Sequence, residues 1–207
     1  MMEKQSAEMI TVFPEDIFQI LTQSVQSVLA SATNDAITYS PMVQVIKKTC
    51  LKPDIGCFVL FSGDFTGLVL LNFSDESAME IYRKYMLSMG MPEEELATNC
   101  TSDEVANSLG ELMNQCIGRF RGDLEKETHI FVYQNQPKML VITEAVEIAV
   151  EAAIDRPQLR KISFKTANGH RFYMEVSLGS MKFYSMFPVK KSEAFDVDDI
   201  MAAGKNQ

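Results

Sequence analysis

The most constraining feature of the sequence is a run of apolar residues between positions 105 and 120 that recurs with the period of an α-helix. At about 100° per residue, one sector of about 140° collects Val105, Leu109, Leu112, Met113, Cys116, Ile117 and Phe120. A sector of about 60° on the opposite side collects Asn107, Glu111, Asn114 and Gly118. The pattern therefore predicts a long helix with one face against a core and one polar face in solvent.

Local signals predict where this helix and two others begin. Thr101 and Glu104 have the Thr-x-x-Glu spacing of a capping box, so we place the start of the long helix there. Apolar residues recur at helical spacing after Pro14, which predicts an opening helix. Ser74 can cap a further helix that runs to about Gly90, because its hydroxyl can accept hydrogen bonds from free backbone amides.

Most of the other segments have strand patterns. We predict strands at residues 42–50, 56–62, 67–73, 158–166 and 171–178, with further strand from His129. The last two strands form a hairpin through Asn168-Gly169, and residues 143–154 are predicted as helix from their Ala and Glu content. Short turns between consecutive strands favour antiparallel pairing. The predicted class is α+β, a largely antiparallel sheet with long helices packed on one face.

The length of 207 residues fits one domain. We expect a flexible leader at residues 1–13, a single domain at 14–187 and an acidic, mobile tail at 188–207. The start of the chain lacks the pattern of a secretory signal, and the uncharged stretch 17–34 is half polar, so we expect a cytoplasmic protein that does not span a membrane.

Charge and residue types exclude several classes of function. A net charge of −9 disfavours binding to nucleic acid and to anionic membranes. The four cysteines include no Cys-x-x-Cys pair, and with only two histidines no familiar zinc spacing can be written, so we expect reduced, buried thiols and no metal site. The glycines match neither a dinucleotide fingerprint nor a nucleotide P-loop.

The polar face of the long helix is part of a sequence motif that extends beyond the helix. Ser108-Leu109-Gly110-Glu111-Leu112-Met113-Asn114 is followed, after twenty-two residues, by Pro137. This spacing resembles the pattern Asp/Ser-x3-Glu-x2-Asn-x22-Pro of the CheC, CheX and FliY phosphatases. The neighbouring pair Glu104/Asn107 does not fit, because Ile130 stands at the place of the proline.

A second segment is also similar to this family. Residues 63–78, Gly-Asp-Phe-Thr-Gly-Leu-Val-Leu-Leu-Asn-Phe-Ser-Asp-Glu-Ser-Ala, resemble its glycine-bounded turn, strand and helix start. The resemblance covers roughly residues 14–178. It is greatest to CheX, which has one active helix, because the opening helix has Phe18 three residues after Glu15 and so lacks a second Glu/Asn pair.

The resemblance implies dephosphorylation of the aspartyl phosphate of a CheY-like receiver in chemotaxis or two-component signalling. Glu111 and Asn114 would be the catalytic pair, with Asn114 positioning water and Glu111 contacting the receiver's lysine. Asn107 and Gly118 would lie at the partner interface. The protein would need no cofactor of its own, since the receiver supplies Mg²⁺, and it would form a homodimer like the CheX relatives.

Two other interpretations remain open. The chain could bind a phosphorylated receiver or a flagellar-switch protein without catalysis, which Asn107 favours because the family has Asp or Ser there. Alternatively, Asn107, Glu111 and Asn114 are a solvated helix face and Pro137 only begins a strand.

Overall fold

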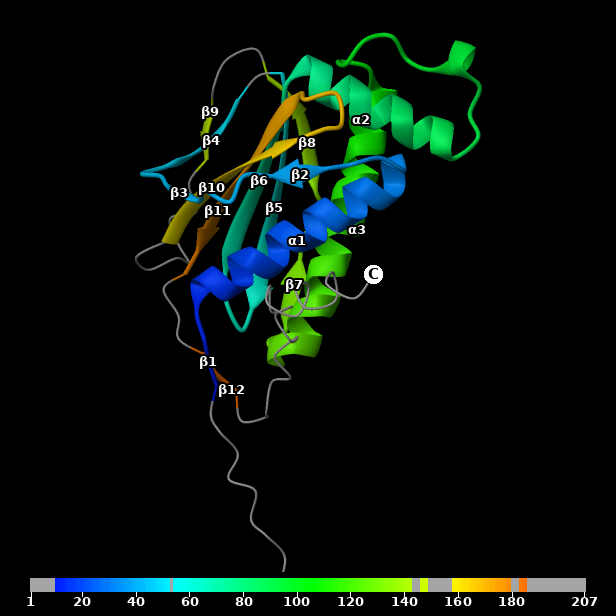
Figure 1. Ribbon diagram of the computed structural model, residues 1–207. Coiled ribbons are helices and arrows are strands. Elements are labelled where there is room, and N and C mark those ends of the chain that lie inside the picture. The colour runs from blue at the N-terminus through cyan, green and yellow to red at the C-terminus, as the bar shows by residue number, and fades with distance from the viewer. Residues whose placement is uncertain (1–9, 53, 143–145, 149–157, 180–182, 186–207) are drawn as a thin grey trace, which may run out of the picture.

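The computed structural model describes residues 10–52, 54–142, 146–148, 158–179 and 183–185 of the chain, and Figure 1 shows their arrangement. The elements in chain order are β1 (Ile10–Val12), α1 (Pro14–Thr33), β2 (Thr38–Tyr39), β3 (Gln44–Val45), β4 (Thr49–Leu51), β5 (Ile55–Gly63), β6 (Gly67–Phe73), α2 (Asp75–Ser88), the short 3-10 helix η1 (Glu93–Glu95), α3 (Asp103–Thr128), β7 (Val132–Gln134), β8 (Lys138–Val141), β9 (Val146–Ile148), β10 (Gln158–Lys165), β11 (Arg171–Leu178) and β12 (Phe183–Ser185).

The main sheet is antiparallel and has eight strands. Its strand order is β2-β10-β11-β6-β5-β7, with β3 also paired to β10 and β8 also paired to β5. The long central strands β5, β6, β10 and β11 carry the β-branched and aromatic residues that favour this conformation. The α+β class predicted from the sequence is confirmed.

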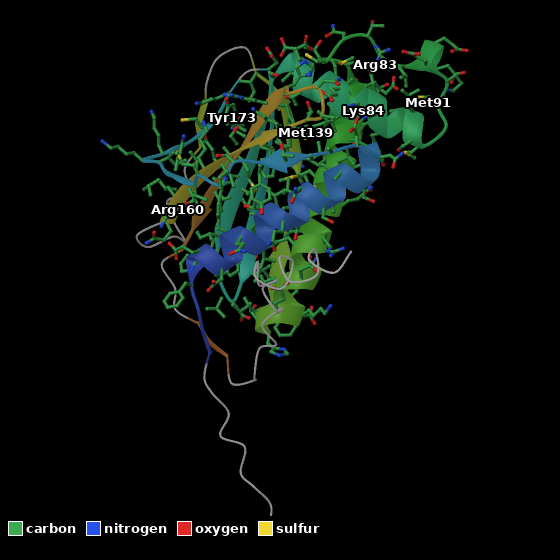
Figure 2. All side chains as sticks on the ribbon, viewed as in Figure 1. Arg83, Lys84, Met91, Met139, Arg160 and Tyr173 are labelled. Atoms are coloured by element: carbon green, nitrogen blue, oxygen red, sulfur yellow. The ribbon has the colours of Figure 1, made fainter. Side chains whose placement is uncertain are left out.

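All three long helices cover one face of the sheet, as predicted (Figure 1). The core between the layers contains the apolar sides of α1, α2 and α3 and every second residue of the central strands, as expected for strands that alternate their faces. Phe164 and Phe172 stack in this core with ring centroids 4.9 Å apart. Figure 2 shows side chains filling the space between the helices and the sheet.

The opposite face of the sheet, which we call the outer face, is partly covered by the small sheet of β4 and β9. Leu51 of β4 packs there against Leu68 and Leu70 of β6. Two buried polar side chains attach β4 and its flank to the main sheet: Glu175 accepts a 2.9 Å hydrogen bond from the backbone amide of Cys50, and Asn72 exchanges two hydrogen bonds with the backbone of residues 50 and 52.

The predicted capping box at Thr101 and Glu104 is wrong. Ser102 is the N-cap of α3, and its hydroxyl accepts a hydrogen bond from the amide of Val105. The carboxylate of Glu104 accepts instead from the hydroxyl of Tyr82 on α2. Glu104 therefore makes a tertiary contact with α2 and not the capping contact that the sequence pattern predicts. The predicted cap of α2 at Ser74 is confirmed.

Two other predicted segments differ from the structure. Residues 42–50 do not form one strand, because β3 pairs with β10 in the main sheet while β4 pairs with β9. The helix predicted at 143–154 is wrong at β9, which is extended; the rest of that prediction lies outside the described residues. The hairpin of β10 and β11 is confirmed, although its turn uses residues 166–169 and only Gly169 has a positive φ, of 89°.

The expected leader includes β1, which pairs with β12. Residues 1–9 and the expected tail at 188–207 lie outside the described part of the chain. Within the part that is described, no helix combines the length and the hydropathy that crossing a membrane requires.

Candidate functional site

The long helix α3 holds the predicted motif in a fixed orientation. Every apolar residue predicted to face the core is buried, and Phe120 meets Phe61 of β5 edge-on with centroids 5.4 Å apart. The helix packs on α1, α2, β5 and β8. Its rotation about its own axis is therefore set by the core, and its polar face points away from the sheet.

We define the α3 stripe as the four residues Asn107, Glu111, Asn114 and Gly118. Asn107, Glu111 and Gly118 are exposed, whereas Asn114 is half-buried and so is less accessible than predicted. The Oε1 atom of Glu111 accepts a 3.4 Å hydrogen bond from Nε2 of Gln115, one turn further along. Neither Asn side chain has a hydrogen-bond partner among the described residues. Both amides are thus free to bind another molecule.

Gly110 lies beside the stripe, where α3 meets β8. A Cβ atom at this position would come within 3.3 Å of Cγ of Met139, which is tighter than most such contacts. A glycine therefore allows β8 to pack closely on the helix. Pro137 immediately precedes β8, so this contact brings the motif's distant proline and its helical part to neighbouring elements.

Two other glycines of α3 have no such packing role. A Cβ atom added at Gly118 or Gly122 would have no neighbour within 4 Å. Glycine inside a helix costs about 0.5 to 1 kcal/mol relative to alanine. Gly118 within the stripe and Gly122 one turn beyond it are thus exposed helix positions that lower stability. Because neither has a side chain, another molecule can approach the backbone of α3 closely there.

The chemistry available at the stripe is that of one carboxylate and two amides. Cys116 lies on the opposite, buried side of α3, and burial raises the pKa of its thiol far above the usual range. Burial also raises the pKa of nearby Cys57 to about 12, so both sulfurs are thiols at neutral pH. The described residues contain no group of three or more His, Cys, Asp or Glu side chains that could hold a metal ion. The stripe can therefore position a water or a charged group of a partner.

Several solved chemotaxis proteins have a fold similar to that of this chain. CheX from Desulfovibrio desulfuricans has a TM-score of 0.62 and 18% identity, covering 79% of this chain and 99% of that chain. A CheC-like superfamily protein from Shewanella sp. PV-4 has a TM-score of 0.64 and 19% identity, covering 79% and 97%. The CheX of a CheX-CheY-BeF3-Mg²⁺ complex from Borrelia burgdorferi has a TM-score of 0.58 and 13% identity, covering 79% and 98%. The fold is thus that of CheX and CheC-like proteins.

At the level of sequence, the chain belongs to the family described as "Protein of unknown function (DUF3334)", which matches residues 8–207. No curated protein matches the sequence significantly.

Besides the half-burial of Asn114, three features of the site were not predicted from the sequence. The contact of Gln115 with Glu111 could have been found from their spacing of four residues, which places side chains together on a helix. Gly122, one turn beyond Gly118, could have been found by extending the stripe. The packing of Met139 on Gly110 depends on the tertiary fold and has no local signal.

Proposed function

We propose that this chain docks through the α3 stripe on the receiver domain of a CheY-like response regulator and hydrolyses its aspartyl phosphate. The observation that carries the proposal is the joint placement of Glu111 and Asn114, one turn apart on a helix that the core fixes, in a CheX-like fold. The CheX-CheY complex from Borrelia burgdorferi supports a receiver as the partner. Such a reaction takes place in the cytoplasm, where receivers act.

The chemistry of the stripe suits this reaction. In-line hydrolysis of a phosphoryl group requires a positioned water and balanced charge more than it requires a protein nucleophile. The unbonded amide of Asn114 can hold that water, with its carbonyl oxygen accepting a hydrogen bond. The carboxylate of Glu111 can pair with the receiver's lysine and fix the docking register. The receiver binds the Mg²⁺ that offsets the charge of the phosphate.

The test is phosphate release from receivers of the same cell, phosphorylated and incubated with wild type or with Asn114→Ala. We expect wild type to accelerate release and Asn114→Ala to abolish the acceleration while still binding the phosphorylated receiver. Gln23→Ala is the matched control, because it removes an exposed amide on α1, outside the stripe. Equal rates for wild type and Asn114→Ala would refute the catalytic role.

A second candidate function is binding of the phosphorylated receiver, or of a flagellar-switch protein, without hydrolysis. Asn107 favours it, because a neutral amide stands where the resembling family has Asp or Ser. Asn107 is exposed and unbonded among the described residues, so Asn107→Asp can be made without disturbing the core. Binding without hydrolysis by wild type, together with hydrolysis by Asn107→Asp, would support this second function.

We also propose that the protein acts as a homodimer. The resemblance to CheX implies pairing of sheets at an edge, and the β2–β3 edge here exposes large apolar side chains: Met42 is 69% exposed and Val45 is 76% exposed. Light scattering at micromolar concentration should give about twice the 23.3 kDa of one chain. A mass of one chain would contradict the dimer.

A further inference from the structure

Two cations lie side by side on the outer face of the sheet. Lys165 of β10 and Arg171 of β11 are direct cross-strand partners. Their neighbours Phe164 and Phe172 are fully buried in the core with the helices. Because successive side chains of a strand point to opposite faces, Lys165 and Arg171 point away from α3 and its stripe.

The charges of this pair are not compensated. Like charges directly opposite each other in a sheet are destabilising. Among the described residues, neither Lys165 nor Arg171 has a hydrogen bond or an ion pair. Lys161, four residues earlier on the same face, differs: its ammonium lies 3.4 Å from the carboxylate of Glu175 and 4.3 Å from the ring centroid of Tyr173, which Figure 2 labels. On β10 and β11, Lys161 is thus neutralised, whereas the pair Lys165 and Arg171 has no anion.

The cationic pair lines an open pocket of about 410 Å³. The other lining residues all carry hydroxyl groups, and they are Thr38, Tyr39, Ser40 and Ser163. No carboxylate lines this pocket. The pocket on the other side of the β2 edge differs, because it contains Arg160 already paired with Glu15 at 2.8 Å.

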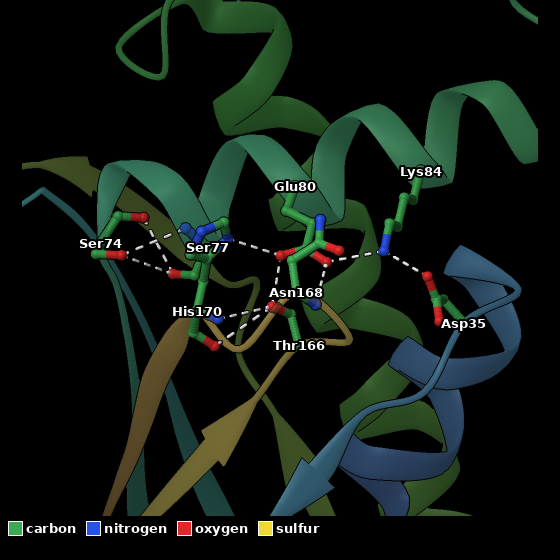
Figure 3. A network of polar contacts seen from close by, with 8 residues as sticks. All are labelled: Asp35, Ser74, Ser77, Glu80, Lys84, Thr166, Asn168 and His170. Atoms are coloured by element: carbon green, nitrogen blue, oxygen red, sulfur yellow. Dashed lines mark hydrogen bonds and ion pairs between the residues drawn. The ribbon is translucent and has the colours of Figure 1, made fainter.

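The loop between the two cations is held in place by a network that Figure 3 shows. Glu80 of α2, with only 5% of its side chain exposed, accepts hydrogen bonds from the Thr166 hydroxyl at 2.5 Å and from the Asn168 amide at 3.2 Å. The backbone amide of Thr166 also donates to the carbonyl of His170 at 2.9 Å. Because Lys165 and Arg171 directly flank this loop, their separation is preorganised, which reduces the entropic cost of binding a ligand.

We propose that this pocket binds the phosphate group of a small molecule. A guanidinium can contact two phosphate oxygens at once, an ammonium supplies a second positive charge, and the hydroxyls can donate to a third oxygen. The volume lies within the range of about 300 to 1,000 Å³ of small-molecule sites. The net charge of −9 disfavours a long polyanion such as nucleic acid.

The experiment is calorimetric titration of the full chain with inorganic phosphate and, separately, with adenosine monophosphate, at constant ionic strength set by potassium chloride. We expect wild type to bind at least one probe and the double variant Lys165→Gln/Arg171→Gln to bind it at least tenfold more weakly. The control Lys47→Gln/Lys126→Gln removes two exposed lysines elsewhere and should bind as wild type does. Tighter binding of the nucleotide would identify an organic phosphate as the ligand, and equal binding would identify the free anion.

Two results would overturn the proposal: no binding of either probe by wild type at about 10 mM, or equal affinity in wild type and the double variant. A second measurement tests the uncompensated charge itself. In phosphate-free buffer the double variant should melt at the same temperature as wild type or higher, since it lacks the repulsion, and a lower melting temperature would contradict the argument. Receiver dephosphorylation should be unchanged in the double variant, so this test is independent of the α3 stripe.

Discussion

The Nδ1 atom of His170 lies 2.8 Å from Oε2 of Glu80, and this contact joins helix α2 to the loop between β10 and β11 (Figure 3). The same carboxylate lies 2.8 Å from the ammonium of Lys84, which also pairs with Asp35 after α1. One nearly buried glutamate therefore connects two helices to the hairpin of the sheet.

The first prediction concerns the pH dependence of folding through Glu80. Burial alone would raise the pKa of this carboxyl, but hydrogen bonds from Lys84, Thr166, Asn168 and His170 lower it below its ordinary value of 4.5. A lowered pKa contributes stability above pH 4.5 that is lost as the pH falls through the folded-state value. Glu80→Gln should lower the free energy of unfolding at pH 7 by about 2 kcal/mol.

Urea unfolding of wild type and Glu80→Gln at several pH values between about 3 and 7 measures this contribution. The difference between the two proteins should shrink as the pH falls below about 4.5. A difference that does not change with pH would show that the charge of Glu80 contributes nothing.

The second prediction separates docking from catalysis at the α3 stripe. Glu111→Gln keeps the shape of the side chain and its contact with Gln115 but removes the charge, so it should weaken receiver binding by about 1.5 to 3 kcal/mol. Asn114→Ala should leave binding nearly unchanged. Because both positions are outside the core, neither variant should change the free energy of unfolding by more than about 0.5 kcal/mol. Titration with the phosphorylated receiver measures both affinities, and equal affinities would contradict the assignment of roles.

The third prediction is that Gly118→Ala has opposite effects on the stability of the fold and on receiver binding. Nothing in the chain contacts a Cβ atom there, so Gly118→Ala should stabilise the fold by about 0.5 to 1 kcal/mol. The added methyl group should weaken receiver binding if the partner approaches the backbone of α3 closely. The control is Gly122→Ala, because Gly122 lies one turn from Gly118 in the same helix and should give a similar gain in stability. Gly90→Ala is unsuitable, because Gly90 has a φ of 86°. Stabilisation without any loss of binding would place the interface elsewhere.

The fourth prediction concerns the orientation of α3. Cys116 is fully buried and its thiol pKa is raised by that burial, so it should resist thiol reagents in the folded protein, while half-buried Cys50 should react faster. Cys116→Asp should lower the free energy of unfolding by about 4 kcal/mol, because it would bury an unpaired charge. Mass spectrometry after brief labelling identifies the modified cysteine, and rapid modification of Cys116 would mean that the helix faces are reversed.

The two faces of α3 could be predicted from the sequence because both follow from one helical period, which the apolar residues from Val105 to Phe120 share. The start of the helix could not. Thr101 and Ser102 are both suitable caps, and the choice depends on Glu104, whose carboxylate binds Tyr82 from another helix. The break between β3 and β4 was missed for a similar reason, since a strand pattern does not say which sheet each half will join.

The candidate site could likewise be predicted only in part from the sequence. Glu111 and Asn114 were found because their spacing and their distance from Pro137 are properties of the linear chain. The half-buried state of Asn114 and the contact between Gly110 and Met139 required the position of β8, which is a property of the folded sheet.

Because α3 forms a wall of the core with one side and carries the stripe on the other, the motif should tolerate many substitutions but no change of length. Inserting one residue between Asn107 and Asn114 would rotate the following turns by about 100° relative to the core. Either the apolar side chains would then leave the core, or the amide of Asn114 would turn away from Asn107. In natural relatives of this chain, insertions and deletions should therefore be confined to the loops on either side of this helix.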